Sequence, residues 1–297
     1  MQDGLARQRA LPYLLLLIAA ASFGGNWVAA RVVNFEVAPF ALSFWRWAIA
    51  AVILFPFAAT QLRQDAPLIR RHFPGLFVFG AVGAGGFTLL GYWGVSYTTA
   101  INATLLNSSL PLFVVPLSWL LLGLTVSGRQ LAGLVLSLAG VVSIVSGGTL
   151  QTLARLTLNP GDFLILGGAF LWAIYTVTLK WRPPLRALSF LFTTIASAAA
   201  VSLPFYLWEM WTGTTMTVSP TAVATIAYLA IFPSIVAYIC WNQAVAALGP
   251  NVVGFFNPVI PVFGILFAVI FLGEPLRAYH LAGFALVLGG VVLTSRR

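Results

Sequence analysis

Residues 107–142 read NSSLPLFVVPLSWLLLGLTVSGRQLAGLVLSLAGVV, and residues 257–292 read NPVIPVFGILFAVIFLGEPLRAYHLAGFALVLGGVV, 150 positions further along the chain. The two stretches share asparagine, proline and glycine, which unrelated apolar sequences seldom match at one fixed offset. The shared positions are Asn107, Pro111, Gly123, Leu131, Ala132, Gly133, Gly140, Val141 and Val142, each repeated 150 positions later. A fixed period of this kind indicates an internal repeat.

The repeat continues upstream with small changes in spacing, so it covers most of the chain. The sequence ALSF at 41–44 recurs at 187–190. Nearer the start of each half, Phe23 corresponds to Trp172 and Asn26 to Tyr175. We therefore expect two related halves, which occupy residues 11–147 and 160–295.

The composition places both halves in a membrane. Hydrophobic residues make up 60% of the 297 positions and charged residues only 7%, whereas soluble domains carry about 25% charged residues. A membrane-spanning helix needs roughly 20 apolar residues, and polar positions divide the chain into ten such runs. The predicted spans are 11–33, 39–60, 74–97, 100–123, 129–147, 161–180, 187–208, 221–247, 251–272 and 279–295. The predicted fold class is an all-α membrane protein with short connections.

Five spans in each half have a consequence for orientation. Because five is odd, the second half enters the membrane from the side opposite to the first. Two similar units of opposite orientation form an inverted repeat, which is the architecture of many secondary transporters. The sequence thus predicts ten transmembrane helices in two inverted five-helix repeats, and alternating access as the mechanism.

The basic residues predict the orientation of the chain. A nucleic-acid partner would need a basic patch or stripe, but here the cations stand at span ends. With a cytoplasmic N-terminus, three cations fall outside: Arg31, Arg155 and Arg277. Eleven fall inside: Arg7, Arg9, Arg63, Arg70, Arg71, Arg129, Lys180, Arg182, Arg186, Arg296 and Arg297. This bias follows the positive-inside rule and predicts a multi-pass plasma membrane (bacterial inner membrane) protein with both termini in the cytoplasm.

The first span has a second interpretation. Arg7 and Arg9 precede an apolar run that ends in small residues, as in a cleavable secretory signal. A retained helix is the preferred interpretation, because a matching helix opens the second half. The single cysteine, Cys240, excludes an intramolecular disulfide.

Several motifs together resemble a known family. They are SFGGNW at 22–27, YTTA at 97–100 with Asn102–Ala103, ALGP at 247–250, Pro258–Val259, LGEPL at 272–276 and LAG at 281–283. They resemble the drug/metabolite transporter superfamily, in its EamA-like branch of ten-helix permeases. The resemblance implies an internally duplicated fold and the export of metabolites such as amino acids. The first half departs from the pattern at 123–125, where GLT replaces the Gly–Glu pair of many members.

Two prolines suggest polar points inside the membrane. A proline within a helix frees the carbonyl four residues earlier, so Pro111 would free that of Asn107 and Pro261 that of Asn257. In lipid such groups need partners or a wet cavity. We expect both asparagines either to contact substrate or to hold a local kink and neighbouring helices together.

Aromatic residues are 14% of the chain, and several lie inside spans beside polar ones. Small-molecule sites combine apolar walls with a few polar groups, which suits amino acids with neutral or aromatic side chains. The alternative is lipid contact or packing. The candidate substrate-binding residues of this kind are Asn26, Trp27, Tyr92, Trp93, Trp172, Tyr175, Tyr238, Trp241 and Asn242.

Arg46 completes the candidate site. It lies seven residues past Pro39, roughly 10 Å into the membrane, where a charge at a helix centre costs about 2.5–3.5 kcal/mol. One interpretation is a cation that faces the cavity and meets a substrate carboxylate. The other is a side chain that snorkels to the outer interface.

The remaining polar residues bear on coupling and assembly. The acids and both histidines fall at span ends, whereas proton-coupled carriers place such groups in the path. We therefore expect facilitated movement of substrate down its gradient. Gly133, Ser137 and Gly140 form a small-residue face on one span, for packing within the chain or for a dimer interface, so the partner state stays open between monomer and homodimer.

Together these patterns predict a carrier that exports amino acids or similar small metabolites. Within the same family, the alternative substrates are drugs or nucleotide sugars. The alternatives of another class are a membrane channel and an intramembrane enzyme. An enzyme would need a nucleophile with its base, a metal cluster or paired carboxylates, and the sequence has no such motif. No cofactor, metal or nucleic-acid partner is expected; the lipid bilayer and a small-molecule substrate are.

Overall fold

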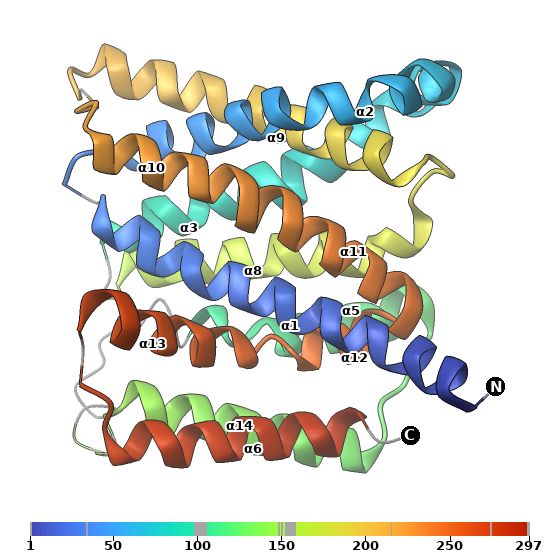
Figure 1. The fold of residues 1–297 in the computed structure, drawn as a ribbon, viewed down its shortest axis with the longest axis vertical. Coiled ribbons are helices and arrows are strands. Elements are labelled where there is room, and N and C mark those ends of the chain that lie inside the picture. Colours follow the sequence, from blue (N-terminus) through green and yellow to red (C-terminus); the bar gives the residue numbers. More distant parts are fainter. Residues whose placement is uncertain are drawn as a thin grey trace.

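A computed structural model of the chain gives the structure of most of the sequence. It describes residues 2–33, 35–97, 106–147, 149, 151, 159–214, 216–273 and 275–295. Every regular element in these residues is a helix, as the sequence predicts. The helices lie side by side with their axes roughly parallel or antiparallel, with α2 and α9 along one edge of the molecule and α6 and α14 along the opposite edge (Figure 1).

Seven helical segments of the described chain are long and apolar enough to cross a membrane. They are Ala10–Ala30, Pro39–Val95, Gly128–Val145, Pro160–Trp181, Ala187–Trp211, Pro220–Leu248 and Pro250–Phe271. Two shorter helices, Leu110–Leu122 and Ala278–Thr294, are equally apolar. The chain is thus built as a multi-span bundle.

The first half begins with α1 and a long helical run. Its elements are α1 (Gln2–Val32), α2 (Pro39–Val78), the π-helical η1 (Phe79–Gly86), α3 (Phe87–Val95), α5 (Leu110–Leu122) and α6 (Gly128–Val145). The run from α2 to α3 folds back on itself, because Ser43 near its start hydrogen-bonds Thr88 near its end across 2.9 Å. This 57-residue run therefore supplies two arms, which correspond to the predicted spans 39–60 and 74–97.

The described part of the second half is also helical and again contains one π-helical segment. Its elements are α8 (Pro160–Thr178), the 3-10 turn η2 (Leu179–Trp181), α9 (Ala187–Trp211), α10 (Pro220–Leu229), the π-helical η3 (Ala230–Val236), α11 (Ala237–Leu248), α12 (Pro250–Phe255), α13 (Val259–Leu272) and α14 (Ala278–Ser295). The two π-helical segments start at corresponding positions, 79 and 230. α5 and α13 both end on glycines with a left-handed backbone, Gly123 (φ 66) and Gly273 (φ 67).

α2 and α9 pack antiparallel and cap each other. The Glu209 carboxylate, near the end of α9, accepts the N–H groups of Phe40 (3.2 Å) and Ala41 (2.7 Å) at the start of α2. At the other end, Asp65 of α2 accepts the N–H of Arg186 just before α9 (3.0 Å) and pairs with its guanidinium (3.2 Å). Both carboxylates satisfy donors that a helix N-terminus leaves unpaired.

The small-residue face predicted for one span packs inside the chain. A Cβ at Gly133 would lie 2.6 Å from the Gly290 carbonyl oxygen, and one at Gly140 would lie 2.7 Å from that of Gly283. The backbones of α6 and α14 approach this closely because neither carries a side chain there. The structure therefore agrees with the first interpretation of this small-residue face, which is packing within the chain.

Two predicted spans are discontinuous. The second half turns at 256–258, between α12 and α13, and the first half turns at 108–109, before α5. Pro111 and Pro261 accordingly lie in the first turns of α5 and α13, where a helix has no use for their missing N–H. The expectation of prolines within continuous helices was wrong, and a break precedes each proline instead.

Candidate functional site

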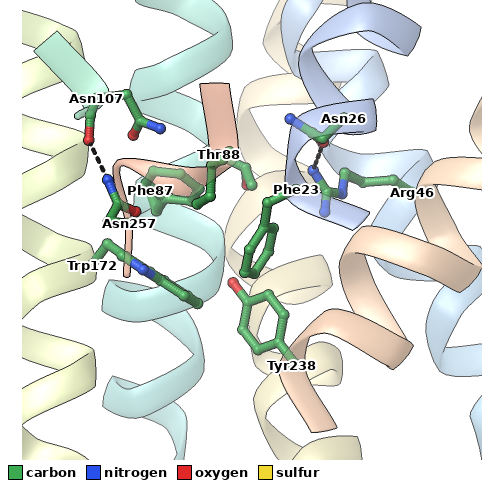
Figure 2. Close-up of a pocket in the computed structure, with 10 residues that line it drawn as sticks. Phe23, Asn26, Arg46, Phe87, Thr88, Asn107, Trp172, Tyr238 and Asn257 are labelled. Carbon is green, nitrogen blue, oxygen red and sulfur yellow. Dashed lines mark hydrogen bonds between the residues drawn. The ribbon is translucent and has the colours of Figure 1, made fainter. Parts of the chain in front are cut away.

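A small buried cavity lies between the two halves of the chain. Its lining residues come from helices of both halves and are Phe23, Asn26, Arg46, Phe87, Thr88, Asn107, Trp172, Tyr238, Asn257 and Ile260. Figure 2 shows Asn26 and Arg46 on one side and the Asn107–Asn257 pair on the other, with aromatic rings between them. The cavity measures about 20 Å³, which is room for roughly one water molecule. Most of the lining side chains are buried, so little free space remains at this site.

Arg46 is the charged group of this lining. Only 2% of it is exposed, so the snorkelling interpretation was wrong. Its Nη1 donates to Asn26 Oδ1 (2.8 Å) and to the Tyr92 hydroxyl (2.6 Å). Its Nε and Nη2 both donate to Ser234 Oγ, at 3.0 and 2.8 Å. The guanidinium also lies over the Trp47 ring, 4.6 Å from its centroid.

Ser234 was not predicted, and the reason it stands here lies in the backbone of η3. Pro233 has no N–H, so the Leu229 carbonyl four residues earlier cannot have an α-helical donor, and the backbone is π-helical there, with the donor five residues on. The Ser234 hydroxyl also donates to that carbonyl (2.8 Å). The lone pairs of the Ser234 oxygen accept the two hydrogen bonds from Arg46. The signal that could have found it is a Pro–Ser pair inside an apolar span.

Thr88 plays a similar part in α3 and was also missed. Its hydroxyl donates to the Ala84 carbonyl (2.9 Å) and accepts from Trp47 Nε1 (2.9 Å). Ser43 lies at hydrogen-bonding distance on another side. Phe87 and Ile260, which line the cavity as well, carry no signal that separates them from other apolar residues.

Asn107 and Asn257 meet at the cavity. The Asn257 amide donates to the Asn107 carbonyl oxygen across 2.9 Å (Figure 2). The expectation that both carbonyls are free was only half right: that of Asn257 accepts the N–H of Ile260 (3.0 Å), because the chain turns there rather than continuing as α-helix. The two breaks therefore hold each other in place across the repeat.

An aromatic cluster closes the other side of the cavity. The Trp172 ring stacks on Tyr175 with 5.1 Å between centroids and meets the edge of Tyr238 at 5.1 Å. Trp241 packs against Trp172 at 5.4 Å and donates from Nε1 to the Thr176 hydroxyl (3.2 Å). Trp172 and Tyr238 line the cavity, whereas Tyr175 and Trp241 lie behind them.

Two larger cavities lie beyond this cluster, at the end of the bundle where α8 and α11 finish and α9 begins. Each measures about 410 Å³, and we call them the end cavities. Tyr175 is part of the first, and Asn242 is part of the second. The Tyr175 hydroxyl donates to Asn242 Oδ1 across 2.9 Å. This hydrogen bond therefore lies between the central cavity and the end cavities.

Five of the predicted site residues do not line the central cavity: Tyr92, Trp93, Tyr175, Trp241 and Asn242. Trp93 is 36% exposed and packs against Phe40 and Tyr97. Its neighbour Tyr92 faces inward, and consecutive residues on a helix point about 100° apart, so both could not line the site. The side chain of Trp27 lies outside the described residues.

With this geometry described, the comparisons with known proteins can be stated. The EamA-like transporter family matches residues 10–146 and 159–296, one match in each half. The chain belongs to this family. It is a multi-pass membrane transporter, as the resemblance implies, and the three relatives described next are named for transport or export.

The relatives are similar over nearly their whole length. An uncharacterized transporter of Archaeoglobus fulgidus is 31% identical, with 96% of this chain and 97% of that protein covered. A "Probable terminal-alkyne amino-acid exporter" of Streptantibioticus cattleyicolor is 28% identical over 86% and 84% of the two chains. A "Probable amino-acid metabolite efflux pump" of Salmonella typhimurium is 25% identical over 94% and 93%.

The fold has a solved counterpart. One crystal structure matches with a TM-score of 0.79 and covers 96% of both chains. Its sequence identity is 18%, so the likeness concerns the fold alone.

Proposed function

We propose that this EamA family transporter is a carrier that exports amino acids, neutral or aromatic, or similar small metabolites by alternating access. The observation that supports this most is the small, buried central cavity between the two halves. A channel needs a continuous path, whereas here an aromatic cluster separates the cavity from the end cavities. A binding site that is closed in one state and must open in another is what a carrier requires.

The proposed architecture is ten spans in two inverted repeats, at 11–147 and 160–295. Seven candidate spans, one of them folded back into two, and two shorter apolar helices together account for ten. Corresponding helices meet antiparallel: Ser137 Oγ donates to the Val287 carbonyl, 150 positions away. Two antiparallel copies related in this way lie upside down relative to each other in a membrane, which supports the exchange of roles between them.

The substrate class follows from the lining. Aromatic rings of Phe23, Phe87, Trp172 and Tyr238 form apolar walls, and amides and a guanidinium supply the polar points. Such a mixture fits a small molecule with an apolar side chain and a polar backbone. The names of two relatives, an amino-acid exporter and an amino-acid metabolite efflux pump, favour the same class.

We further propose that transport is facilitated rather than driven by protons. The acidic side chains of the described residues have partners away from the cavity: Glu36 with Ser219, Asp65 with Arg186, Asp162 with Asn159, and Glu209 with the start of α2. A proton-coupled carrier would place such a group in its path.

A counterflow assay tests the proposal. Purified protein in proteoliposomes preloaded with unlabelled amino acid should take up the same labelled amino acid transiently and saturably, and a panel of amino acids identifies the best. Vesicles without protein are the control. Flux that neither saturates nor shows counterflow would point to a channel, and uphill accumulation abolished by collapsing a pH gradient would overturn the facilitated mechanism.

A further inference from the structure

The two halves carry the same hydrogen bond with its residues exchanged. In the first half the Tyr92 hydroxyl donates to Asn26 Oδ1 and joins α3 to α1, at 2.9 Å. In the second half the Tyr175 hydroxyl donates to Asn242 Oδ1 and joins α8 to α11, also at 2.9 Å. Position 26 corresponds to 175, and 92 to 242 at the 150-residue offset. We call these the first and second Tyr–Asn bonds.

The two bonds lie on opposite sides of the central cavity. Tyr92 is four residues beyond Thr88 of the lining, and Asn242 is four residues beyond Tyr238. The helices that carry them run in opposite directions, since Gly94 packs near Gly161 while Gly83 packs near Tyr175. Tyr92 and Asn242 therefore lie about 6 Å along their helices from the cavity lining, in opposite senses, while Asn26 of the first bond is part of that lining. The second bond faces the end cavities, and the first closes the far side.

In the described structure a cation hydrogen-bonds the members of the first bond, whereas Arg182 lies near the second bond without a hydrogen bond to it. Arg46 Nη1 donates to both members of the first bond, Asn26 and Tyr92. The position that corresponds to Arg46 in the second half, through the ALSF repeat, is Phe192. Arg46 hydrogen-bonds neutral oxygens alone in the described structure, and these contacts use four of the five donor positions of a guanidinium.

A buried cation with neutral partners is a strong site for an anion. Most of the cost of removing the guanidinium from water is already met in the folded protein. A carboxylate offers two charged oxygens that match the guanidinium fork, and its charge adds a Coulomb attraction that the neutral oxygens do not supply. A carboxylate that enters the cavity would therefore compete with Asn26 and Tyr92 for the same N–H groups.

We propose that Arg46 binds the carboxylate of the transported molecule, and that this carboxylate displaces Asn26 and Tyr92 and so loosens the first Tyr–Asn bond. The inference rests on the proposed function and names the chemical group that its central cavity recognises. Substrate that enters from the end cavities then weakens the closure on the far side, while the second bond, to which Arg46 makes no hydrogen bond, keeps its Tyr175–Asn242 contact. Loading on one side is thereby linked to release on the other.

Competition by analogues tests this on the unaltered protein. Counterflow of labelled phenylalanine is measured with two unlabelled competitors: 3-phenylpropionate, which keeps the carboxylate, and phenylalaninamide, which lacks it. We expect 3-phenylpropionate to compete at least about tenfold better than phenylalaninamide, since a lost charge-assisted bond is worth this much. This comparison also tells whether an amino acid or a simple organic acid supplies the carboxylate.

Amino-acid substitutions test which residues produce the preference for the carboxylate. Arg46→Gln should abolish the preference for the carboxylate, and Arg46→Lys should retain part of it; Arg70→Gln, an exposed arginine at the turn of α2, is the control. Tyr92→Phe should lower the KM for phenylalanine severalfold, because it removes one competing acceptor. Tyr175→Phe removes the corresponding hydroxyl of the second bond and should keep the wild-type preference, whatever its effect on rate.

The outcomes separate this inference from the proposed function. Saturable counterflow of phenylalanine that phenylalaninamide inhibits as well as 3-phenylpropionate would overturn the role of Arg46 and leave the carrier intact. An unchanged preference in well-folded Arg46→Gln protein would overturn it too. Counterflow of none of the three compounds would instead contradict the proposed amino-acid carrier, and the inference would fall with it.

Discussion

The hydroxyl of Ser234 hydrogen-bonds two groups inside the membrane. One is the Leu229 carbonyl at the start of the π-helical η3, and the other is the Arg46 guanidinium, which needs acceptors. A single side chain satisfies both because a hydroxyl both donates and accepts. The charge at Arg46 is thus held by an irregularity in a helix of the other half of the chain.

Removal of this hydroxyl should cost stability. We expect Ser234→Ala to destabilise the folded protein by about 1–3 kcal/mol, since it leaves two donor positions of the buried Arg46 guanidinium without their acceptor. The measurement is the unfolding temperature in detergent. Ser189→Ala is the matched control: Ser189 is fully buried, yet its hydroxyl has no partner in the described structure. An equal loss in both variants would contradict this account.

The same residues mark how far sequence reasoning reached. Asn26, Arg46, Asn107 and Asn257 could be predicted because a polar residue inside an apolar span needs a reason. Ser234 could not, since its role depends on a contact with Arg46 across 188 positions. The prediction that Trp93 lines the site was wrong, because composition alone does not tell which side of a helix faces the cavity.

At the scale of elements, glycine decides how closely α6 and α14 approach. A methyl group at Gly290 would collide with Ser137 Oγ and the Gly133 carbonyl oxygen. Its neighbour Gly289 faces the Leu136 side chain at an ordinary 3.7 Å. Two adjacent glycines on one helix therefore have opposite requirements.

This contrast gives a matched pair of variants. Gly290→Ala should destabilise the protein by about 1–3 kcal/mol through overpacking. Gly289→Ala should be neutral or stabilising, because alanine favours a helix by up to about 1 kcal/mol over glycine. Thermal unfolding of the two purified variants checks this, and equal unfolding temperatures would show that the helices separate at little cost.

Hydropathy predicted the elements well and their interruptions poorly. The run expected at 221–247 is helical from Pro220 to Leu248. The breaks before Pro111 and Pro261 were not foreseen, because an apolar sequence looks the same whether its backbone continues or turns. The π-helical segments η1 and η3 were missed for the same reason: one extra residue in a turn leaves hydropathy unchanged.

At the scale of the whole molecule, a contact between distant segments constrains the orientation. Asp65 follows the first arm of the long helical run, and Arg186 follows α8. The two residues form an ion pair. The turns near 70 and 180 therefore lie at the same end of the bundle. The opposite end holds the contact between Glu36 and Ser219. This agrees with the sidedness that the basic residues predict.

Cysteine tagging should confirm that sidedness. In a Cys240→Ser background, which has no other thiol, Arg70→Cys and Lys180→Cys should react with an impermeant maleimide only after cells are permeabilised. Phe35→Cys, at a position 98% exposed near the other end, should react in intact cells. Labelling of positions 70 and 180 from opposite sides would contradict the two-repeat arrangement.

The reciprocal caps of α2 and α9 have a mechanical meaning. Each helix is fastened at its first turn to a carboxylate of the other, at both ends of a shared length. Because α2 and α9 are joined at both ends of their contact, they cannot slide past each other, and the pair should move as one rigid unit. When the protein changes the side on which it is open, the moving helices should rotate relative to this rigid pair. Loss of either carboxylate contact, at Glu209 or at Asp65, would allow α2 and α9 to shift against each other.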